Sequence, residues 1–501
     1  MLQYLTRSLP PVCAAERHAY DVVARLHEAG HEAYTVGGAV RDRLLGSVPD
    51  DVDVTTSATP DVVQGLFPRT YAIGAAFGVV IVVEDDIQTE VATFREDYGY
   101  QDGRRPDSVH FSDAEHDAQR RDFTINALLY DPRVGRIVDY VDGLRDLERG
   151  VIRAIGDPDR RFSEDYLRLL RAARFAARFD FELDADTLKA ITTHAAQVVN
   201  ISPERIFAEL TKMLCGPRPA CAFRLLDATG LLAHVLPEIA AMKGVAQPAQ
   251  YHPEGDVFVH TLMLLENTRH PTPEIAWSAL LHDVGKPPTF EIGHHGRETF
   301  PCHAKVGAEM TEAILRRLRC SRHFIDCVRE VVYHHMSFGE VQKMRPATLR
   351  RMLGRSTFNV ELELHRVDCM SSHRKLGNYV YLLDELVALR DQPAVPPPLA
   401  TGRDVLARGI AAGPVVGEIL RELEEEVLSE QLFVVEQRQL EQFMRDKIAI
   451  DEEQAALRVA LLRIHQKTKL PMGVPKDPEE VQERLRALRQ ARRLRGALLQ
   501  Q

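Results

Sequence analysis

The stretch YTVGGAVRDRLLGSVPDDVDVTT, residues 34–56, contains two short apolar segments separated by a glycine pair and a helical segment. The second apolar segment carries Asp51 and Asp53, and side chains two positions apart on a strand point to the same side. Two adjacent carboxylates raise each other's pKa unless a cation lies between them. The pattern therefore predicts a strand with paired carboxylates, which form either a cation site or an ordinary exposed strand edge.

Length and composition limit the possible functions of the chain. A length of 501 residues predicts three or four domains, and 45% hydrophobic with 27% charged residues is typical of a soluble globular protein. The seven cysteines form no C-x-x-C pair, which predicts a reducing, cytoplasmic compartment. We find no signal-peptide pattern and no apolar run long enough to cross a bilayer, so no membrane partner is expected. The net charge of −10 argues against non-specific coating of nucleic acid.

Strand and helix signals divide the chain into regions. The segments FGVVIVVED (77–85) and QTEVATFR (88–95) predict a hairpin with an acidic turn. Helical periodicity dominates from about residue 151. It includes SEDYLRLLRAARFAARFDF (163–181), whose first residue is a predicted N-cap. A proline-rich linker over 391–402 precedes a helical tail. These signals predict an α+β protein.

Two glycines and an arginine precede the aspartate pair. Gly37 and Gly38 allow the backbone to approach a phosphate closely, and Arg41 can bind phosphate oxygens through two N–H groups. Paired carboxylates such as Asp51 and Asp53 can hold Mg²⁺ beside a triphosphate. The combination predicts two-metal nucleotidyl transfer, in which one ion activates the attacking hydroxyl and the other stabilises the leaving pyrophosphate.

The order of several motifs carries a resemblance to a known family. The chain resembles class II tRNA nucleotidyltransferases in GGAVRD with DDVDVTTSATP, in RRDFTINALLYDP (120–132), in DGLRDLERGVIRAIGDP (142–158) and in SEDYLRLLRAARF (163–175). These are the CCA-adding enzymes and bacterial poly(A) polymerases of the DNA polymerase β superfamily. The resemblance covers about residues 30–235 in the family's order and spacing. It implies a nucleotidyltransferase head with a small mixed β-sheet, an all-α neck and body, and a helical tail.

The resemblance also assigns roles to single residues. The aspartate pair matches the metal-binding carboxylates of the family, and Glu90 is either a third carboxylate or a surface glutamate. Asp122 and Asn126 are four positions apart, which would place them on one helix face. The family assigns this segment, together with Arg121, to ribose and phosphate contacts, although helix capping alone would explain Asp122.

Asp165 and Arg168 are predicted to select the base. They are three positions apart and would share one face of a helix. Cytosine and adenine each present an amino donor beside a ring-nitrogen acceptor, which match a carboxylate and a guanidinium, whereas uracil and guanine present the opposite pattern. The pair thus predicts selection of CTP and ATP without a nucleic-acid template, in agreement with the family. The spacing alone would fit a surface salt bridge. Arg171 and Arg174 continue this helix face and are expected to contact the triphosphate or the tRNA.

A second set of metal-ligand residues follows in the helical region. Its members are His260, His282, Asp283, His303, His334, His335 and Asp368. Their order resembles the HD phosphohydrolase superfamily, in which His303, His334 and His335 would match the extra ligands of binuclear members and the other four the primary set. Imidazole and carboxylate suit a transition metal such as Ni, Mn, Co, Fe or Zn. The resemblance implies a metal-activated water that attacks a phosphoester, with Lys286 steadying the phosphate.

The resemblances predict four domains. A nucleotidyltransferase head is expected over 1–155, a helical neck and body that binds base and RNA over 156–245, an all-α HD domain over 246–390, and a linker with a helical tail over 391–501. The arginine-rich end of the tail, within 433–501, could bind tRNA, pair subunits or form a solvated face.

The predicted function is template-independent addition of CCA to tRNA 3′ ends from CTP and ATP. The HD domain would add 2′,3′-cyclic phosphodiesterase or phosphatase activity. The loop FREDYGYQDGRRPDSVHF (94–111) resembles one that complete CCA-adding enzymes keep, so full CCA addition is preferred over A-adding or poly(A) polymerase activity. An alternative of another class is an HD phosphohydrolase with an RNA-binding head.

Overall fold

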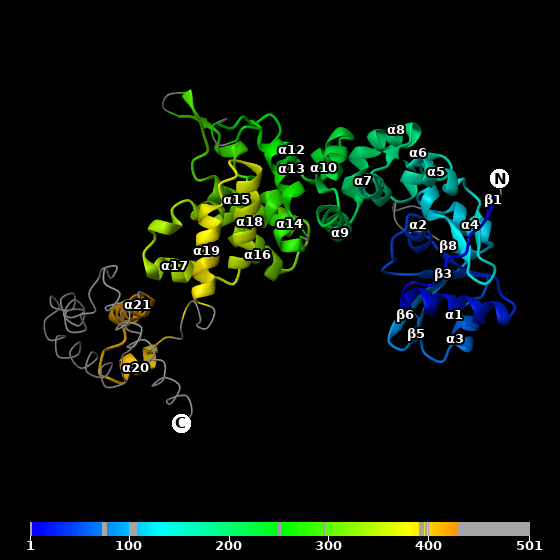
Figure 1. Ribbon diagram of the computed structural model, residues 1–501, viewed down its shortest axis with the longest axis horizontal. Coiled ribbons are helices and arrows are strands. Elements are labelled where there is room, and N and C mark those ends of the chain that lie inside the picture. Colours follow the sequence, from blue (N-terminus) through cyan, green and yellow to red (C-terminus); the bar gives the residue numbers. More distant parts are fainter. Residues whose placement is uncertain are drawn as a thin grey trace, which may run out of the picture. The chain divides into compact units, whose positions relative to one another are not determined.

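The computed structural model describes residues 3–428, except for 73–77, 100–107, 249, 251, 270, 294–295, 390–394, 396–397 and 399. The middle of the predicted loop 94–111 and the tail over 433–501 therefore lie outside the described residues. The N-terminal part mixes strands with helices, and the rest is mostly helical (Figure 1). The described chain divides into two compact units, one within 1–336 and 360–375 and the other within 337–359 and from 376 onward.

The head is built on a mixed eight-stranded sheet with the order β1-β10-β9-β2-β3-β6-β5-β4. Its strands are β1 (Gln3–Thr6), β2 (Ala33–Val36), β3 (Asp53–Thr56), β4 (Thr70–Tyr71), β5 (Val79–Glu84), β6 (Ile87–Thr93), β9 (Leu129–Asp131) and β10 (Arg136–Asp139). Strands β3 and β6 run parallel, and the other neighbours run antiparallel. The predicted hairpin is β5–β6, and its turn residues Asp85 and Asp86 have positive φ angles of 46° and 62°.

Helices pack against this sheet and fix the position of β3. The head helices are α1 (Ala14–Glu28), α2 (Gly38–Leu44), α3 (Pro60–Leu66), α4 (Ala114–Gln119) and α5 (Gly143–Arg149). Apolar residues of α1 and α3, such as Val22 and Val63, form a core with Val54 of β3 and Val91 of β6. Burial of this apolar surface is the main favourable term that holds the strand in place.

The neck departs from the sequence prediction at its first helix. Its helices are α6 (Pro158–Glu164), α7 (Leu167–Phe179), α8 (Ala185–His194), α9 (Pro203–Leu214), α10 (Pro219–Ala228), α11 (Leu231–Val235) and α12 (Pro237–Ala240). Ser163 is not an N-cap, because it lies inside α6 and its hydroxyl donates to the Arg160 carbonyl at 2.8 Å. Asp165 is extended and its carboxylate accepts from the Leu167 amide at 3.0 Å. This local side chain–backbone bond competes with helix geometry and separates α6 from α7.

Further helices build the histidine-rich region and the C-terminal part of the described chain. They are α13 (Val257–Asn267), α14 (Pro273–Leu281), α15 (His303–Arg317), α16 (Arg322–His334), α17 (Pro346–Leu353), α18 (Phe358–Ser371), α19 (Gly377–Ala388), α20 (Gly402–Leu406) and α21 (Pro414–Leu428). Buried Trp277 of α14 stacks on Phe207 of α9 with ring centroids 5.2 Å apart. The predicted α+β fold class is confirmed, whereas the four-domain division stays a prediction.

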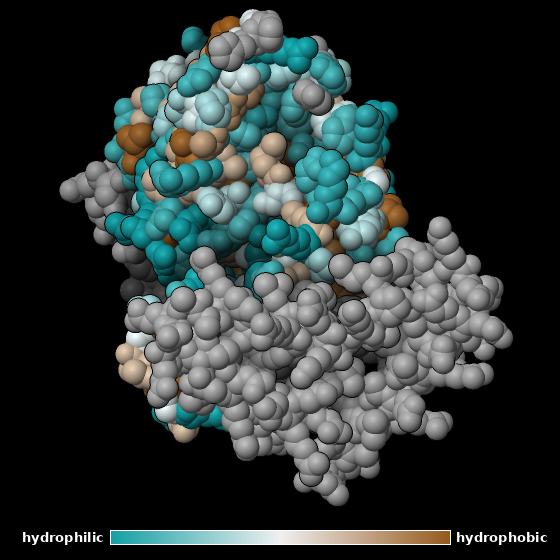
Figure 2. Space-filling view, turned by 90° about the vertical axis from the view of Figure 1, so that its left-hand side faces the viewer, coloured by the Kyte–Doolittle hydropathy of each residue, from teal (hydrophilic) through white to brown (hydrophobic). Residues whose placement is uncertain are grey.

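The remaining strands form short pairs. They are β7 (Arg95–Tyr98) with β8 (Ser108–Phe111), β11 (Val151–Ile152) with β12 (Glu182–Leu183), and β13 (Glu291–Ile292) with β14 (Glu298–Thr299). On the face drawn in Figure 2, the described surface is mostly hydrophilic and its apolar residues are scattered. Among the described residues, no helix has both the length and the apolar character that a bilayer crossing requires.

Candidate functional site

The paired aspartates lie at the start of β3. Asp51 and Asp53 are exposed, whereas Val52 and Val54 are buried, so the two carboxylates lie on the same side of the chain as predicted. In the antiparallel register Asp53 lies opposite Val36, the residue before Gly37. The structure thus brings the aspartate pair next to the predicted glycine pair at the end of β2.

Electrostatics at Asp53 favour a bound cation. Desolvation by the surrounding protein, followed by the Glu90 carboxylate and then Asp51, raises the pKa of Asp53 to about 6, while Arg121 opposes the rise. Glu90 is exposed on β6, the parallel neighbour of β3. Three carboxylates gathered at one strand end fit Mg²⁺, a hard cation that prefers oxygen ligands and keeps open positions for substrate phosphates.

Arg121 lies beside Gly37. Gly37 has a φ of +74°, which favours glycine, and a Cβ there would make a tight contact 3.2 Å from Arg121 Nη1. The Arg121 side chain is 20% exposed and donates through Nη2 to Asp117 at 3.2 Å. It therefore combines a fixed position with an accessible charge next to Asp53.

Arg41 does not fulfil the predicted role of a phosphate-facing arginine. It is only 3% exposed, donates through Nε to Asp42 at 2.8 Å, and donates through Nη1 to Asn126. Its guanidinium lies over the rings of Phe175 and Phe179, 5.1 and 4.6 Å from their centroids. These contacts bury the charge between α2 and α7, where it fastens the helix that begins at the glycine pair.

Asp122 and Asn126 meet, but not on an α-helix as predicted. The segment forms a short 3₁₀ helix, η2 (Thr124–Asn126), since Phe123 is extended and pairs with a neighbouring strand segment. Asn126 Nδ2 donates to Asp122 at 3.0 Å, and Arg171 Nε donates to the other carboxylate oxygen at 2.7 Å. Although burial opposes it, the Arg171 charge lowers the pKa of Asp122 to about 2. At 8% exposure, Asp122 links the head to α7.

Asp165 and Arg168 do not form the salt bridge that their spacing alone would favour. Asp165 accepts from Arg205 Nη2 at 2.7 Å, whereas Arg168 Nη1 donates to Glu164 at 2.8 Å. Because Asp165 precedes α7, the two side chains do not share a helix face as predicted. Each is held separately in an oriented, partly exposed position.

A cavity of about 530 Å³ adjoins Asp51. Basic side chains from the neck line it, namely Arg174, Arg178, Lys212 and Arg218. One N–H group of Arg174 is already used within the protein, because its Nε donates to Glu209 at 2.6 Å. Lys212 and Arg218 were missed by sequence reasoning, since they lie beyond the recognised motifs and reach Asp51 only through the packing of the neck helices. Their charge suits a phosphate backbone.

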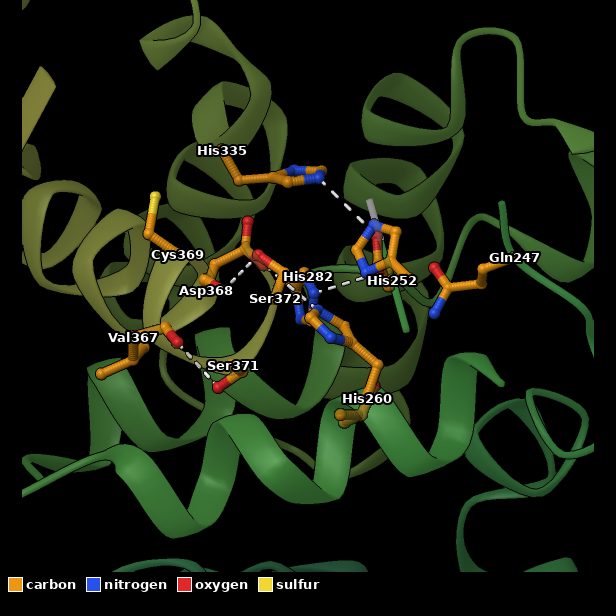
Figure 3. Close-up of polar contacts among 12 residues, drawn as sticks. Gln247, His252, His260, His282, His335, Val367, Asp368, Cys369, Ser371 and Ser372 are labelled. Atoms are coloured by element: carbon orange, nitrogen blue, oxygen red, sulfur yellow. Dashed lines mark hydrogen bonds and ion pairs between the residues drawn. The ribbon is translucent and has the colours of Figure 1, made fainter. Parts of the chain in front are cut away.

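The histidine-rich region brings most of its predicted ligands together. Ligand atoms of His260, His282 and Asp283 lie within 4.8 Å of one another, and so do those of Asp283, His303 and His335. Asp283 belongs to both groups. Asp368 joins the first group, since its Oδ1 lies 3.1 Å from His260 Nε2. Figure 3 shows the side chains of His260, His282, His335 and Asp368 in this region.

Three of the histidines are oriented by backbone carbonyls. The Nδ1 atoms of His282, His303 and His335 lie 2.9, 2.9 and 2.6 Å from the carbonyls of Ala279, Phe300 and Val332. A carbonyl only accepts, so each proton is on Nδ1 and each Nε2 offers a lone pair. His303 Nε2 and His335 Nε2 face each other at 3.2 Å, and buried His282 Nε2 lies 3.0 Å from Asp283 Oδ2. Lone pairs that converge in this way fit a bound metal ion.

The charges of this cluster are strongly coupled. Against the effect of burial, hydrogen bonds to Asp368 and Glu254 raise the pKa of His260 to about 9. Burial lowers the pKa of His335 to about 4. The pKa of Asp283 lies well below its usual value, because His282 and Lys286 outweigh its desolvation. The cluster therefore combines ionised carboxylates with a neutral imidazole, as metal binding requires.

Gly285 allows the two ligand groups to meet. A Cβ at this position would lie 2.2 Å from the His303 carbonyl and 2.6 Å from the Gly307 amide. Only a glycine therefore lets the chain after α14 pack against the start of α15. This contact places Asp283 within 3.7 Å of His303 Nε2.

His334 is the predicted ligand that the structure does not bring to the cluster. Its Nε2 lies 3.5 Å from Glu330, whereas the next residue, His335, is buried among the ligands. His334 is the last residue of α16 and its side chain lies beside Glu330, whereas His335 follows the helix and is buried in the cluster.

Sequence reasoning missed two residues of this region. His252 and Glu254 form a ligand-type group with His260, and Glu254 Oε1 lies 2.7 Å from His260 Nδ1. The segment YHPEGD just before α13 was the available signal. The predicted Lys286 is buried and donates through Nζ to Gln247 at 2.5 Å and lies 2.7 Å from Asp283. A cavity of about 360 Å³ adjoins the cluster, with His252 and Lys286 in its wall.

Family comparisons define the class of protein. The model of the poly(A) polymerase head domain matches residues 33–153, and that of the probable RNA and SrmB-binding site of polymerase A matches 180–243. The HD domain model matches 257–366. Fold and sites thus define a nucleotidyltransferase with an HD domain.

Individual relatives narrow this class. The CCA-adding enzyme of Levilactobacillus brevis is 34% identical over 416 residues, which cover 83% of this chain and 94% of that relative. The chain therefore belongs to the family of CCA-adding enzymes, and the resemblance seen in the sequence is confirmed. The CCA-adding enzyme of Geobacillus thermodenitrificans is 46% identical over 225 residues, 45% of this chain and about half (55%) of that relative. The crystal structure of the Bacillus stearothermophilus CCA-adding enzyme in complex with CTP matches with a TM-score of 0.67 and 27% identity, covering 88% of this chain and 99% of that one.

Proposed function

We propose that this protein adds CCA to the 3′ ends of tRNA from CTP and ATP without a nucleic-acid template. One observation carries the proposal: Asp51 and Asp53 lie side by side next to Gly37 and Arg121, with a cavity lined by basic side chains beside them. The relatives named as CCA-adding enzymes, one of them solved with CTP, support this choice of reaction.

The head residues have separate tasks in this proposal. Asp51 and Asp53, with Glu90 close by, would hold Mg²⁺, which lowers the pKa of the attacking hydroxyl and stabilises the leaving pyrophosphate. Gly37 lets the backbone approach the triphosphate, and Arg121 donates to its oxygens. Gly38 starts α2, and buried Arg41 keeps that helix in position.

The neck residues would choose the base. Asp165 accepts from the amino group of cytosine or adenine, and Arg168 donates to the adjacent ring nitrogen. The separate contacts with Arg205 and Glu164 fix both side chains before the nucleotide arrives, which avoids an ordering cost on binding. Arg171, which lies in the same helix as Arg168, donates to Asp122 of the head. This contact would hold the two base-selecting side chains at a fixed distance from the metal site.

Incubation of the purified protein with tRNA lacking its end tests the proposal. CTP alone should extend the tRNA by two residues, CTP with ATP by three, and UTP or GTP should not be used. Addition should proceed on tRNAs of many sequences and weaken steeply with salt, since shape and backbone contacts dominate. Failure to incorporate CTP, together with addition of A to tRNA that already ends in CC, would indicate an A-adding enzyme, and long adenosine tails would indicate a poly(A) polymerase.

We further propose that the HD cluster hydrolyses phosphoesters, either 2′,3′-cyclic phosphates or phosphomonoesters. His260, His282, Asp283 and Asp368 would hold a first transition metal, and Asp283, His303 and His335 a second. The converging Nε2 atoms carry this proposal. The metal supplies a water of lowered pKa as nucleophile. Lys286, held by Gln247 and Asp283, offers its remaining N–H to the phosphate.

A phosphoesterase assay across added Ni²⁺, Mn²⁺, Co²⁺ and Mg²⁺ tests the second activity. Hydrolysis with at least one of these ions is expected. No hydrolysis with any of them would make the histidines structural. Hydrolysis without any nucleotide addition would instead favour the alternative of an HD phosphohydrolase with an RNA-binding head.

The compartment is part of the same proposal. All seven cysteines are free thiols, a usage that fits a reducing environment. We propose that the reaction takes place in the cytoplasm. The test is to measure both activities at high concentrations of a thiol reductant, where both should be retained.

A further inference from the structure

Glu254 lies between two imidazoles at the wall of the HD cavity. Its Oε1 is 2.7 Å from His260 Nδ1 and 3.0 Å from His252 Nδ1. A carboxylate only accepts, so each Nδ1 carries a proton, and in a neutral His252 ring the Nε2 on the opposite side offers a lone pair. His260 differs, because its Nε2 lies 3.1 Å from a second carboxylate, that of Asp368.

His252 has the same orientation but a different neighbourhood. It belongs to neither of the two ligand groups that contain Asp283, although it forms a third such group with Glu254 and His260. Its ring packs edge-on against His260 with centroids 4.6 Å apart and an interplanar angle of 81°. Its side chain is 19% exposed and forms part of the cavity wall. In the described part of the chain its Nε2 has no protein partner, and Figure 3 shows the ring beside the ligand histidines. The cavity thus contains a fixed acceptor that the metal cluster does not use.

The chemistry of a phosphorylated RNA end limits what this acceptor can bind. A phosphate dianion carries no proton to donate, and its oxygens suit the metal ions and the ammonium group of Lys286, which lines the same cavity. A ribose hydroxyl next to the phosphate does carry a proton and lies within one sugar ring of it. The 2′-hydroxyl is also the group by which proteins distinguish RNA from DNA.

We propose that His252, positioned by Glu254, accepts a hydrogen bond from the ribose hydroxyl adjacent to a terminal 2′- or 3′-phosphate. The HD site would then act on RNA ends and discriminate against deoxyribose. This inference rests on the phosphohydrolase function proposed for the same site and deepens it by naming the residue that would distinguish ribose from deoxyribose. His252 contacts the substrate, and Glu254 is a positioning residue.

Equilibrium binding of non-hydrolysable analogues tests the inference. The probes are the 3′-methylenephosphonate analogues of adenosine and of 2′-deoxyadenosine, titrated calorimetrically into the full chain loaded with Ni²⁺. The wild type should bind the ribose analogue about tenfold more tightly, the typical effect of one oriented hydrogen bond. His252→Phe should remove the difference by weakening only the ribose analogue, and Glu254→Ala should reduce it.

Two control variants complete the experiment. The double variant His282→Ala with Asp283→Ala lacks the metal site, so any analogue that it still binds is bound elsewhere in the chain. This background is subtracted from the binding measured for the other variants. His323→Ala alters an exposed histidine of α16 and should keep the tenfold preference.

The outcomes separate this inference from the function on which it rests. Hydrolysis of 3′-phosphates by the wild type, with equal affinity for both analogues, would overturn the inference and leave the phosphohydrolase standing. An equal loss of both analogues in His252→Phe would also overturn it, because His252 would then contact the phosphate. Absence of both hydrolysis and specific binding in the wild type would overturn the two together.

Discussion

The head and the HD region prepare a metal site in opposite ways. In the head, the proposed ligands Asp51, Asp53 and Glu90 are exposed at a strand end, and in our proposal a triphosphate would complete the site. In the HD region the ligands are buried, and the imidazoles are oriented by carbonyls or by Glu254 before any ion binds. Among the described residues, groups of three candidate ligands whose ligand atoms all lie within 4.8 Å of one another occur only in the HD region.

This difference reflects the substrate. A nucleotidyltransferase releases pyrophosphate after each addition, so a site completed by the triphosphate suits repeated exchange. A site completed by protein ligands keeps its ion, and the binding free energy of that ion also stabilises the surrounding fold. We therefore expect mutations in the HD region to change metal content and stability together, and mutations in the head to change catalysis alone.

The largest effect is expected from Asp53→Asn. Removal of this carboxylate should reduce incorporation of CTP and ATP about 1,000-fold, which corresponds to about 4 kcal/mol of transition-state stabilisation. Binding of tRNA and the melting temperature should change little. The measurement is single-turnover nucleotide incorporation, with Asp61→Asn on the exposed first turn of α3 as a matched control. Undiminished incorporation would exclude this active site.

The double variant His282→Ala with Asp283→Ala should separate the two activities. Both groups belong to the primary ligand set, so metal content measured by mass spectrometry and phosphoester hydrolysis should fall to background. Added Ni²⁺ should raise the melting temperature of the wild type but not of this variant. CCA addition should persist. Its loss would show that the two sites are coupled and that the comparison between independent sites is wrong.

Gly285→Ala should damage the HD site without changing any ligand. The added Cβ would meet the His303 carbonyl and the Gly307 amide, so the packing of α14 against α15 must open. We expect a loss of about 1–3 kcal/mol in the free energy of unfolding and weaker metal binding. Chemical denaturation measures the first, and a competitive chelator the second. Gly65→Ala in α3, where a Cβ meets nothing within 4 Å, is the control and should be neutral or stabilising.

Base choice should depend on partners outside the recognised motif. Asp165→Ala should reduce the discrimination against UTP by about 1–3 kcal/mol, the usual cost of an unsatisfied polar contact. Arg205→Ala should reduce it by a smaller amount, because Asp165 is then free to turn away. Misincorporation assays compare these variants with Arg319→Ala, which removes an exposed arginine that pairs with Glu204. Unchanged selectivity in both Asp165→Ala and Arg205→Ala would refute selection of the base by these residues.

The smallest effects distinguish the adjacent histidines. His335→Ala should weaken metal binding about tenfold, because it removes one of the converging Nε2 atoms. His334→Ala should have a clearly smaller effect, since its ring lies near Glu330. Metal titration of the two variants decides between them, and equal losses would restore His334 to the ligand set that the sequence predicted.

The sequence by itself determined the class of fold, the family and most of the ligands. These features depend on local patterns: the alternation of Asp51 and Asp53 with buried valines, the two turn residues between β5 and β6, and the order of the metal-ligand residues. Strand alternation and motif spacing are fixed along the chain, so a reader of the sequence can use them before any tertiary contact is known.

Only the tertiary structure decided which partner each charged group has. Arg41 is buried under aromatic rings and Arg121 lies beside the glycines, although both stand in recognised motifs. Asp165 pairs with Arg205, forty residues away, and Glu254 orients His260 together with His252, a residue that the motif pattern does not include. A buried charge must find a partner, and the choice depends on which elements pack together across the fold, which spacing along the chain does not specify.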